Sequence, residues 1–302
     1  MKSLPLQSAK VGQPLPWDVL AALFAVYVVW GSTYLAIRVA LISLPPFFLM
    51  GSRFVVAGLC MYFFLRARGA PTPARVQWLH ATIIGALLLG GGMDFVAFAE
   101  QWITSGLTAV SVATMPIWTA LFLGLWGQSP TRMEWTGIVI GFLGVGLLSL
   151  EGNLRANPTG AVALLIAPIC WSFGSALSRK LTLAPGAMGT ASEMMMGGLV
   201  LFLISWLRGE ALTTPLVAEA AWAWLYLVVF GSLIAFTAYM FLLERVRPAL
   251  ATSYAYVNPV IAVLLGVFLA GEQITTAGYV AMVVVLVGIG FITLGRERVQ
   301  KA

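Results

Sequence analysis

The heptapeptide Gly-Val-Gly-Leu-Leu-Ser-Leu at residues 144–150 recurs 144 residues later as Gly-Ile-Gly-Phe-Ile-Thr-Leu at residues 288–294. Five further matches keep the same order along the chain at separations of 140 to 144 residues: Trp30 with Trp171, Arg38 with Arg179, Gly58 with Gly198, Pro116 with Pro259, and Gly127-Gln128 with Gly271-Glu272. Any single match is common in an apolar, glycine-rich chain, but a collinear set is not. The sequence therefore predicts two homologous halves.

The composition around these repeats is that of a membrane protein. Hydrophobic residues make up 60% of the 302 residues and charged residues 9%, and the mean hydropathy is +0.95. A soluble domain typically carries about 25% charged residues, because its surface faces water. This chain has too few charges to cover such a surface, so lipid is the expected solvent.

Ten apolar runs have the length of a membrane-spanning helix, since a bilayer core of about 30 Å needs about 20 helical residues. A transmembrane β-strand would alternate apolar and polar positions, whereas these runs are apolar on all sides, so we expect an all-α membrane protein. The first run is too long for the apolar part of a signal peptide and is expected to be a retained helix. The runs lie at residues 18–40, 46–66, 78–99, 105–126, 134–150, 160–181, 187–207, 220–243, 249–269 and 275–295.

Five spans in each half make the two halves inverted, because the second half then enters the membrane from the opposite side. We expect one five-helix repeat at residues 17–151, a second at 160–295, and cytoplasmic tails at 1–16 and 296–302. Inverted repeats are a recurring transporter architecture, in which a site between the halves is exposed alternately to either side. The repeat therefore favours a secondary transporter.

The net charge of +6 would suggest nucleic-acid binding on a soluble domain; here the distribution of positive charge in the loops explains it better, and no nucleic-acid partner is expected. With the N-terminus inside, only Arg155 and Arg208 lie on the outer face, which agrees with the positive-inside rule and predicts that both termini are cytoplasmic. The other loop and tail cations then all lie inside: Lys2, Lys10, Arg66, Arg68, Arg75, Arg132, Arg179, Lys180, Arg245, Arg247, Arg296, Arg298 and Lys301.

Two stretches resemble a known family. Residues 99–116, with Ala99-Glu100-Gln101, Ser105-Gly106-Leu107-Thr108-Ala109 and Ala113-Thr114-Met115-Pro116, resemble the first half of EamA-type members of the drug/metabolite transporter superfamily. Residues 248–260 (Pro-Ala-Leu-Ala-Thr-Ser-Tyr-Ala-Tyr-Val-Asn-Pro-Val) resemble its YedA-like subgroup of bacterial inner-membrane exporters. The resemblance covers about residues 17–295. It implies ten helices in two EamA repeats, a central cavity, and export or exchange of small organic metabolites or drugs across the inner membrane.

Candidate substrate-binding residues form stripes on the expected helices. Trp30, Tyr34 and Arg38 share one helix face, and Trp171, Ser175 and Arg179 repeat that stripe in the second half. These side chains would line a cavity for an organic substrate. The alternative is that they anchor the helices at the membrane interface.

Matched prolines mark a second group of candidates. Pro116 and Pro259 are expected to kink their helices, and a kink at membrane depth frees carbonyls for a substrate or water. The polar and aromatic residues expected beside them in the cavity are Ser111, Trp118, Tyr254 and Asn258, with Tyr239 as a further candidate. The alternative is that these residues serve helix packing alone.

Asp94 follows Gly90-Gly91-Gly92-Met93 within the third span. The family resemblance implies only small or amide residues there, so Asp94 departs from it. An acidic residue at this depth usually faces a bundle interior or a water-filled cavity. It would carry a proton as the coupling ion, since burial favours the neutral carboxyl, or it would form an ion pair with Arg53 or Arg38. The sequence leaves both open.

Other functions are less well supported. An intramembrane lipid-modifying enzyme needs a nucleophile with a base or a metal cluster, and the single histidine, His80, and scattered acids provide neither pattern. A membrane interaction protein would have a longer loop or tail. We therefore expect no enzyme activity, cofactor or metal. Gly137 and Gly141 form a Gly-x-x-x-Gly pair that would pack the two halves together or form a homodimer.

Overall fold

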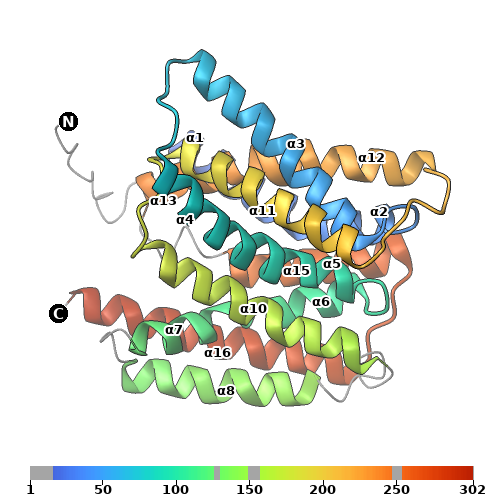
Figure 1. The fold of residues 1–302 in the computed structure, drawn as a ribbon. Helices are drawn as coiled ribbons and strands as arrows, with labels where there is room; N and C mark the ends of the chain where they lie inside the picture. Colours follow the sequence, from blue (N-terminus) through green and yellow to red (C-terminus); the bar gives the residue numbers. More distant parts are fainter. Residues whose placement is uncertain (1–15, 126–129, 149–156, 247–253, 302) are drawn as a thin grey trace.

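The computed structural model describes residues 16–125, 130–148, 157–246 and 254–301 (Figure 1). Within these ranges the regular structure is entirely helical and contains no strand, which confirms the expected all-α class. Large apolar side chains such as Trp17 and Phe268 point outward, with 86% and 77% of their surface exposed, whereas Arg53 and Asp94 are fully buried. This arrangement is the reverse of a soluble protein and suits a lipid environment.

The first half contains helices that follow the expected spans, three of which are divided internally. The helix at residues 17–40 and the helix at 75–99 each contain a wider, π-helical segment (η1 and η2), and the helix at 105–125 is interrupted at Ala113 and Thr114. The elements are α1 (Trp17–Phe24), η1 (Ala25–Val29), α2 (Trp30–Ala40), α3 (Pro46–Ala67), α4 (Arg75–Gly85), η2 (Ala86–Asp94), α5 (Phe95–Ala99), α6 (Ser105–Val112), α7 (Met115–Leu125) and α8 (Arg132–Leu148).

The second half repeats this series. Its third helix, residues 218–245, again contains a π-helical segment in its middle, at the position that corresponds to η2. The elements are α10 (Pro158–Ser178), α11 (Ala187–Leu207), α12 (Ala218–Tyr226), η3 (Leu227–Ile234), α13 (Ala235–Arg245), α15 (Tyr254–Ala270) and α16 (Thr276–Lys301).

Seven helices of the described ranges are long and apolar enough to cross a membrane: Trp17–Ala40, Pro46–Ala67, Arg75–Ala99, Ser105–Phe122, Pro158–Ser178, Ala187–Leu207 and Ala218–Tyr239. Val257–Ala270 and Thr276–Phe291 are shorter apolar helices. The chain is thus a multi-pass membrane protein. The count of ten stays a prediction, because three expected spans run into residues 126–129, 149–156 and 247–253, outside the described ranges.

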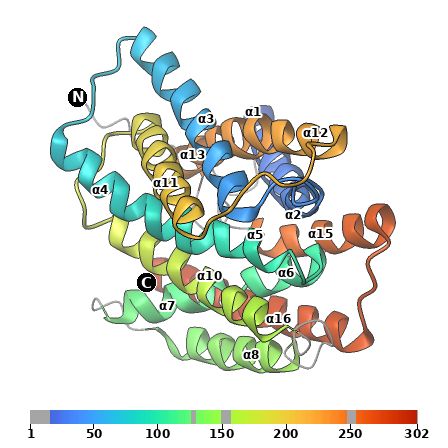
Figure 2. The same cartoon turned by 45° about the vertical axis from the view of Figure 1, so that its right-hand side comes forward.

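Contacts between the halves are symmetric: the main helix contacts recur when the two halves are exchanged. The second helix of each half packs on its counterpart (α3 on α11), and so does the fifth (α8 on α16), as Figures 1 and 2 show. Contacts between unlike helices are also reciprocal. The first helix of each half packs on the third helix of the other half, α10 on η2 and α5, and α2 and α1 on α12 and α13. It also packs on the fourth helix of the other half, α10 on α7 and α2 on α15. This is the packing of two homologous halves around one axis, as the repeats predicted.

Glycines set the closest of these contacts. A Cβ on Gly288 in α16 would lie 2.7 Å from the backbone nitrogen of Gly141 and 2.8 Å from the carbonyl oxygen of Gly137, both in α8. The Gly-x-x-x-Gly pair is therefore used between the halves, one of the two roles expected for it. At the corresponding place on the partner helix, a Cβ on Gly144 would lie 2.9 Å from the nitrogen of Val285.

The two matched prolines have different positions in their helices. Pro116 is the second residue of α7, directly after the break at Ala113 and Thr114, so it starts a helix rather than kinks one. The first helical turn tolerates proline because its amide would have no helical acceptor. Pro259 lies inside α15, as expected, and Pro168 is a further proline inside α10.

Candidate functional site

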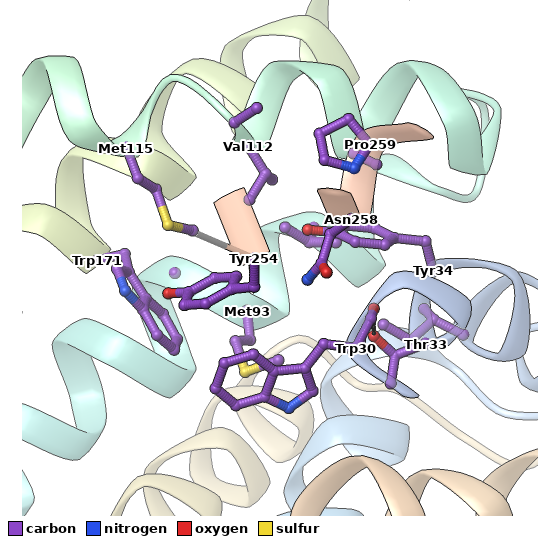
Figure 3. Close-up of a pocket in the computed structure, with 15 residues that line it drawn as sticks. Trp30, Thr33, Tyr34, Met93, Val112, Met115, Trp171, Tyr254, Asn258 and Pro259 are labelled. Carbon is purple, nitrogen blue, oxygen red and sulfur yellow. Dashed lines mark hydrogen bonds between the residues drawn. The ribbon is translucent and has the colours of Figure 1, made fainter. Parts of the chain in front are cut away.

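A cavity lies between the two halves, where α2, η2, α6, α10 and α15 approach one another (Figure 3). Its volume is about 70 Å³, well below the several hundred Å³ of typical sites for drug-sized ligands. A larger substrate therefore requires the surrounding helices to move apart. The lining residues are Trp30, Thr33, Tyr34, Ile37, Gly92, Met93, Val96, Ala109, Val112, Ala113, Met115, Trp171, Tyr254, Asn258 and Pro259.

Trp30 is positioned by the π-helical segment η3. Its indole nitrogen donates to the carbonyl oxygen of Gly231, within η3, at 3.1 Å. A π-helical turn displaces carbonyls from the regular helical pattern, which makes such an acceptor available to a side chain. The rings of Phe236, Tyr239 and Tyr254 pack around the indole with centroid distances of 5.3, 5.2 and 5.0 Å. Trp30 is therefore a fixed wall of the cavity.

The opposite wall comes from η2 and α10. A Cβ on Gly92 would lie 2.9 Å from Cε3 of Trp171, so only glycine lets the indole lie this close to η2. Met93 and Met115 lie near Trp171 and Tyr254 in Figure 3. Thioether side chains are flexible and contact aromatic rings favourably, so this wall can adapt to a ligand.

Among the residues that the structure describes, the lining carries no charged side chain. Its polar groups are Thr33, Asn258, the tyrosine hydroxyls and the indole nitrogens. The Thr33 hydroxyl donates to the carbonyl of Trp30 at 2.6 Å, and the Asn258 amide nitrogen, in the orientation that satisfies its neighbours, donates to the carbonyls of Tyr27 and Tyr254 at 3.2 Å. Desolvating a charged group without a partner is costly, so these walls favour an organic molecule with an apolar, flat part over a multiply charged ion.

Half of the residues expected from the sequence line this cavity. They are Trp30, Tyr34, Trp171, Tyr254, Asn258 and Pro259.

The other half lie elsewhere. Tyr239 packs behind the wall, against Trp30 and Tyr254. The Ser111 hydroxyl donates to the carbonyl of Leu107, and Trp118 packs edge-on against Phe142. Ser175, Pro116 and Asp94 are likewise outside the lining.

Asp94 lies at the end of η2, directly after the lining residues Gly92 and Met93. Its carboxyl is fully buried, and neither oxygen has a hydrogen-bond partner in the described part of the chain. The expected alternative, an ion pair with Arg53 or Arg38, is not what the structure contains. The Arg53 guanidinium bonds the Ser232 hydroxyl through Nε at 2.9 Å, and Arg38 pairs with Glu272 through Nε at 3.5 Å.

Nine of the fifteen lining residues were not predicted from the sequence, among them Thr33, Met93 and Met115. Thr33 is three residues after Trp30 and therefore lies on nearly the same helix face, which was an available signal. Met93 and Met115 lie beside helix irregularities, the end of η2 and the break before α7. Local sequence does not predict such irregularities well.

A bundle of apolar helices from two homologous halves, with an uncharged chamber between them, defines the class of membrane transporters. Comparison with known proteins is more specific: residues 16–150 and 158–294 each match the EamA-like transporter family. The chain belongs to this family, with two EamA repeats, which confirms the resemblance drawn from residues 99–116 and 248–260.

Individual relatives agree with this assignment. The chain is 45% identical over 279 residues to "Uncharacterized inner membrane transporter YedA" of Escherichia coli (strain K12), covering 92% of this chain and 91% of the relative. It is 23% identical over 263 residues to "Uncharacterized transporter YoaV" of Bacillus subtilis (strain 168), covering 85% and 90%. A solved structure described as "Crystal structure of protein" has a TM-score of 0.65 at 21% identity and covers 92% of this chain and 98% of its own. At that identity the structure supports the fold alone.

Proposed function

We propose that the protein is a secondary transporter of the bacterial inner membrane that exports or exchanges small organic metabolites or drugs by alternating access. The observation that carries the proposal is the uncharged aromatic cavity built by both halves, since α2, η2 and α6 come from the first and α10 and α15 from the second. A site made by two halves changes its access when the halves rock against each other. The transporter names of the YedA and YoaV relatives support it.

The proposed topology has ten membrane helices, five per inverted half, with both termini in the cytoplasm. The mirrored contacts of α3 with α11 and of α8 with α16 support the relation between the halves. The distribution of loop Lys and Arg residues supports the orientation. The halves extend over residues 17–151 and 160–295. A homodimer would have to use a surface other than Gly137 and Gly141, which already pack against α16.

The proposed substrate is a small organic molecule with a flat apolar part and at most one charge. Trp30, Tyr34, Trp171 and Tyr254 offer four aromatic rings, and Asn258 and the hydroxyls offer a few hydrogen bonds. Aromatic rings bind apolar and cationic groups. Ser111, Trp118, Ser175 and Tyr239 would contact such a molecule only in another conformation, after the helices have shifted.

Protons are the proposed coupling ion if Asp94 ionises during the cycle. Among the described residues its buried carboxyl has no hydrogen-bond partner, and it directly follows two lining residues, Gly92 and Met93. Asp94→Asn removes the ionisable group at nearly constant shape. We expect it to abolish accumulation driven by a pH gradient while exchange of substrate for substrate continues. Unchanged gradient-driven accumulation would exclude Asp94 as the carrier.

The transport function is tested with purified protein in liposomes. A pool of metabolites, amino acids and drug-like compounds is offered, and mass spectrometry records what accumulates with and without a pH gradient. We expect a few compounds to accumulate only in vesicles that contain the protein. If nothing accumulates with folded, inserted protein in either gradient, the transport proposal fails for every compound class offered.

A further inference from the structure

Glu272 joins the two halves at one end of the bundle, the end where α2 stops and α3 starts. It follows Gly271, whose φ of 64° ends α15 in the left-handed region. Its Oε1 accepts from the backbone nitrogen and the hydroxyl of Ser105, both at 2.9 Å, and its Oε2 accepts from the nitrogen of Gly106 at 3.1 Å. A second-half carboxylate thus caps the N-terminus of first-half helix α6, where negative charge is favoured.

Glu210 makes the same kind of contact at the same end. It follows Gly209, which ends α11 with a φ of 67°. Its oxygens accept from the nitrogens of Phe47 and Phe48, at 3.3 and 2.9 Å, at the start of α3. The matching first-half residues in the sequence are Ala70 and Gln128, neither of which is acidic; Gln128 lies outside the described ranges. Carboxylate caps between the halves are therefore expected at one end only.

Glu100 lies beside the Glu272 cap, in the turn between α5 and α6. Its side chain is 2% exposed, and neither carboxyl oxygen has a hydrogen-bond partner among the described residues. The titratable groups that act on it are Glu272 from the turn before α16 and two residues of α2, Arg38 and Tyr34. Tyr34 also lines the cavity, so Glu100 interacts electrostatically both with the Glu272 cap and with a residue of the cavity wall.

The charge balance around the Glu272 cap depends on the proton of Glu100. Arg38 pairs with Glu272 at 3.5 Å and also donates to the carbonyl of Ile103 at 3.1 Å. One guanidinium thus balances one carboxylate. An ionised Glu100 would add a second negative charge in a buried place, next to the carboxylate that caps α6, and like charges in such a site repel strongly.

The direction of the pH effect follows from the same groups. Burial and then the Glu272 carboxylate raise the pKa of Glu100 well above its usual range, while Arg38 lowers it. Opening this end would let water reach the carboxyl and bring its pKa back toward about 4.3. The closed state therefore binds the proton more tightly, so closure is favoured at low pH and is lost as the pH rises through the raised pKa.

We propose that Glu100 is a proton-binding site that controls the Glu272 cap: proton uptake lets this end of the transporter close, and proton loss releases α6 and opens the chamber to this side. The inference rests on the alternating access proposed above. The proton comes from the solution that this end faces, which the charge distribution of the loops predicts to be the outside. Asp94 is a separate group, deeper in η2, and is not needed for this step.

The test measures access to the chamber rather than transport. The lining residue Ala109 in α6 is replaced by cysteine (Ala109→Cys) in a chain that also carries Cys60→Ser and Cys170→Ser. A membrane-impermeant thiol reagent is added outside proteoliposomes over a range of pH values. Each rate is divided by that of an exposed reporter, Thr213→Cys, which removes the intrinsic pH dependence of the thiol.

We expect the normalised rate to rise with pH by up to about tenfold per unit, the limit for a single proton. In the Glu100→Gln background it should stay low and change by less than about twofold over the same range. Glu100→Asp should restore a pH dependence with a shifted midpoint, and Glu219→Gln, an exposed acid at the start of α12, should behave like the parent chain.

A Glu100→Gln profile that coincides with the parent would overturn the inference, as would a parent rate that does not vary with pH. The Glu100→Asp result shows that the protein still folds when this position is altered. Failure of the transport proposal is distinct, since pH-dependent access in vesicles that accumulate no compound would remove the transport function and leave the proton site.

Discussion

The closest approach between the halves gives a sharp prediction about stability. Gly288→Ala places a methyl group 2.7 Å from the nitrogen of Gly141 and 2.8 Å from the oxygen of Gly137, and both atoms belong to backbone that cannot rotate away. Carbon contacts are optimal at about 3.5–4.0 Å, so α8 and α16 must separate locally. Overpacking of this kind typically costs about 1–3 kcal/mol.

A matched control lies two residues further along the same helix. A Cβ on Gly290 would meet nothing within 4 Å, so Gly290→Ala gains the helix preference of alanine, about 0.5–1 kcal/mol, without the clash. Both variants share that gain, and their difference therefore reports the clash alone. A difference of about 1–3 kcal/mol corresponds to roughly 5- to 150-fold in the ratio of folded to unfolded protein.

The assay is reversible unfolding of the purified protein in mixed micelles with increasing sodium dodecyl sulfate, followed by tryptophan fluorescence and far-ultraviolet circular dichroism. Gly288→Ala should unfold at a lower denaturant fraction than Gly290→Ala. Equal stability of the two variants would refute the close contact of α8 with α16, and with it the role assigned to the Gly-x-x-x-Gly pair.

Two further predictions concern the chamber and its closed end. Trp171→Ala should weaken binding of a transported compound by at least about tenfold in titration calorimetry while the protein stays folded, because the indole forms a wall of the cavity. The control is Trp102→Ala, which lies outside the lining. Equal affinities of the two variants would show that Trp171 has a structural role only. Glu210→Gln should lower the free energy of unfolding by about 0.5–2 kcal/mol in thermal unfolding, because the carboxylate caps the start of α3. Glu219→Gln should have little effect. An equal loss in both variants would contradict the capping role of Glu210.

Patterns that repeat along the chain predicted most of the fold. The collinear matches indicated two homologous halves, and the paired contacts of α3 with α11 and α8 with α16 agree. Helical spacing also placed Trp30 and Tyr34 on the face that lines the cavity. Periodicity succeeds here because a helix surrounded by other helices and lipid repeats its environment every turn.

Local sequence patterns did not predict the contacts made at helix ends and irregular turns. The two caps, Glu210 and Glu272, depend on contacts with segments more than 160 residues away. The role of Glu100 depends in turn on the Glu272 cap beside it. Pro116 lies at the start of a helix because α6 ends at Val112 and α7 begins at Met115. The sequence match of Pro116 with Pro259 does not reveal this interruption. The comparison of Arg68-Gly69-Ala70 with Arg208-Gly209-Glu210 carried a usable signal, an acid present in one half only.

The π-helical segments have a consequence for comparing relatives of this protein. A wider turn accommodates one more residue than an α-helical turn over the same rise, so the residues after Asp94 are rotated by about 100° relative to an uninterrupted helix of 3.6 residues per turn. A homologue that lacks one residue between Ala86 and Asp94, and therefore has a regular helical turn there, would keep both its span length and the faces that the residues beyond this point present. A single-residue gap within a span of this family then marks the loss of a wide turn, and an alignment that closes the gap would compare residues on different helix faces.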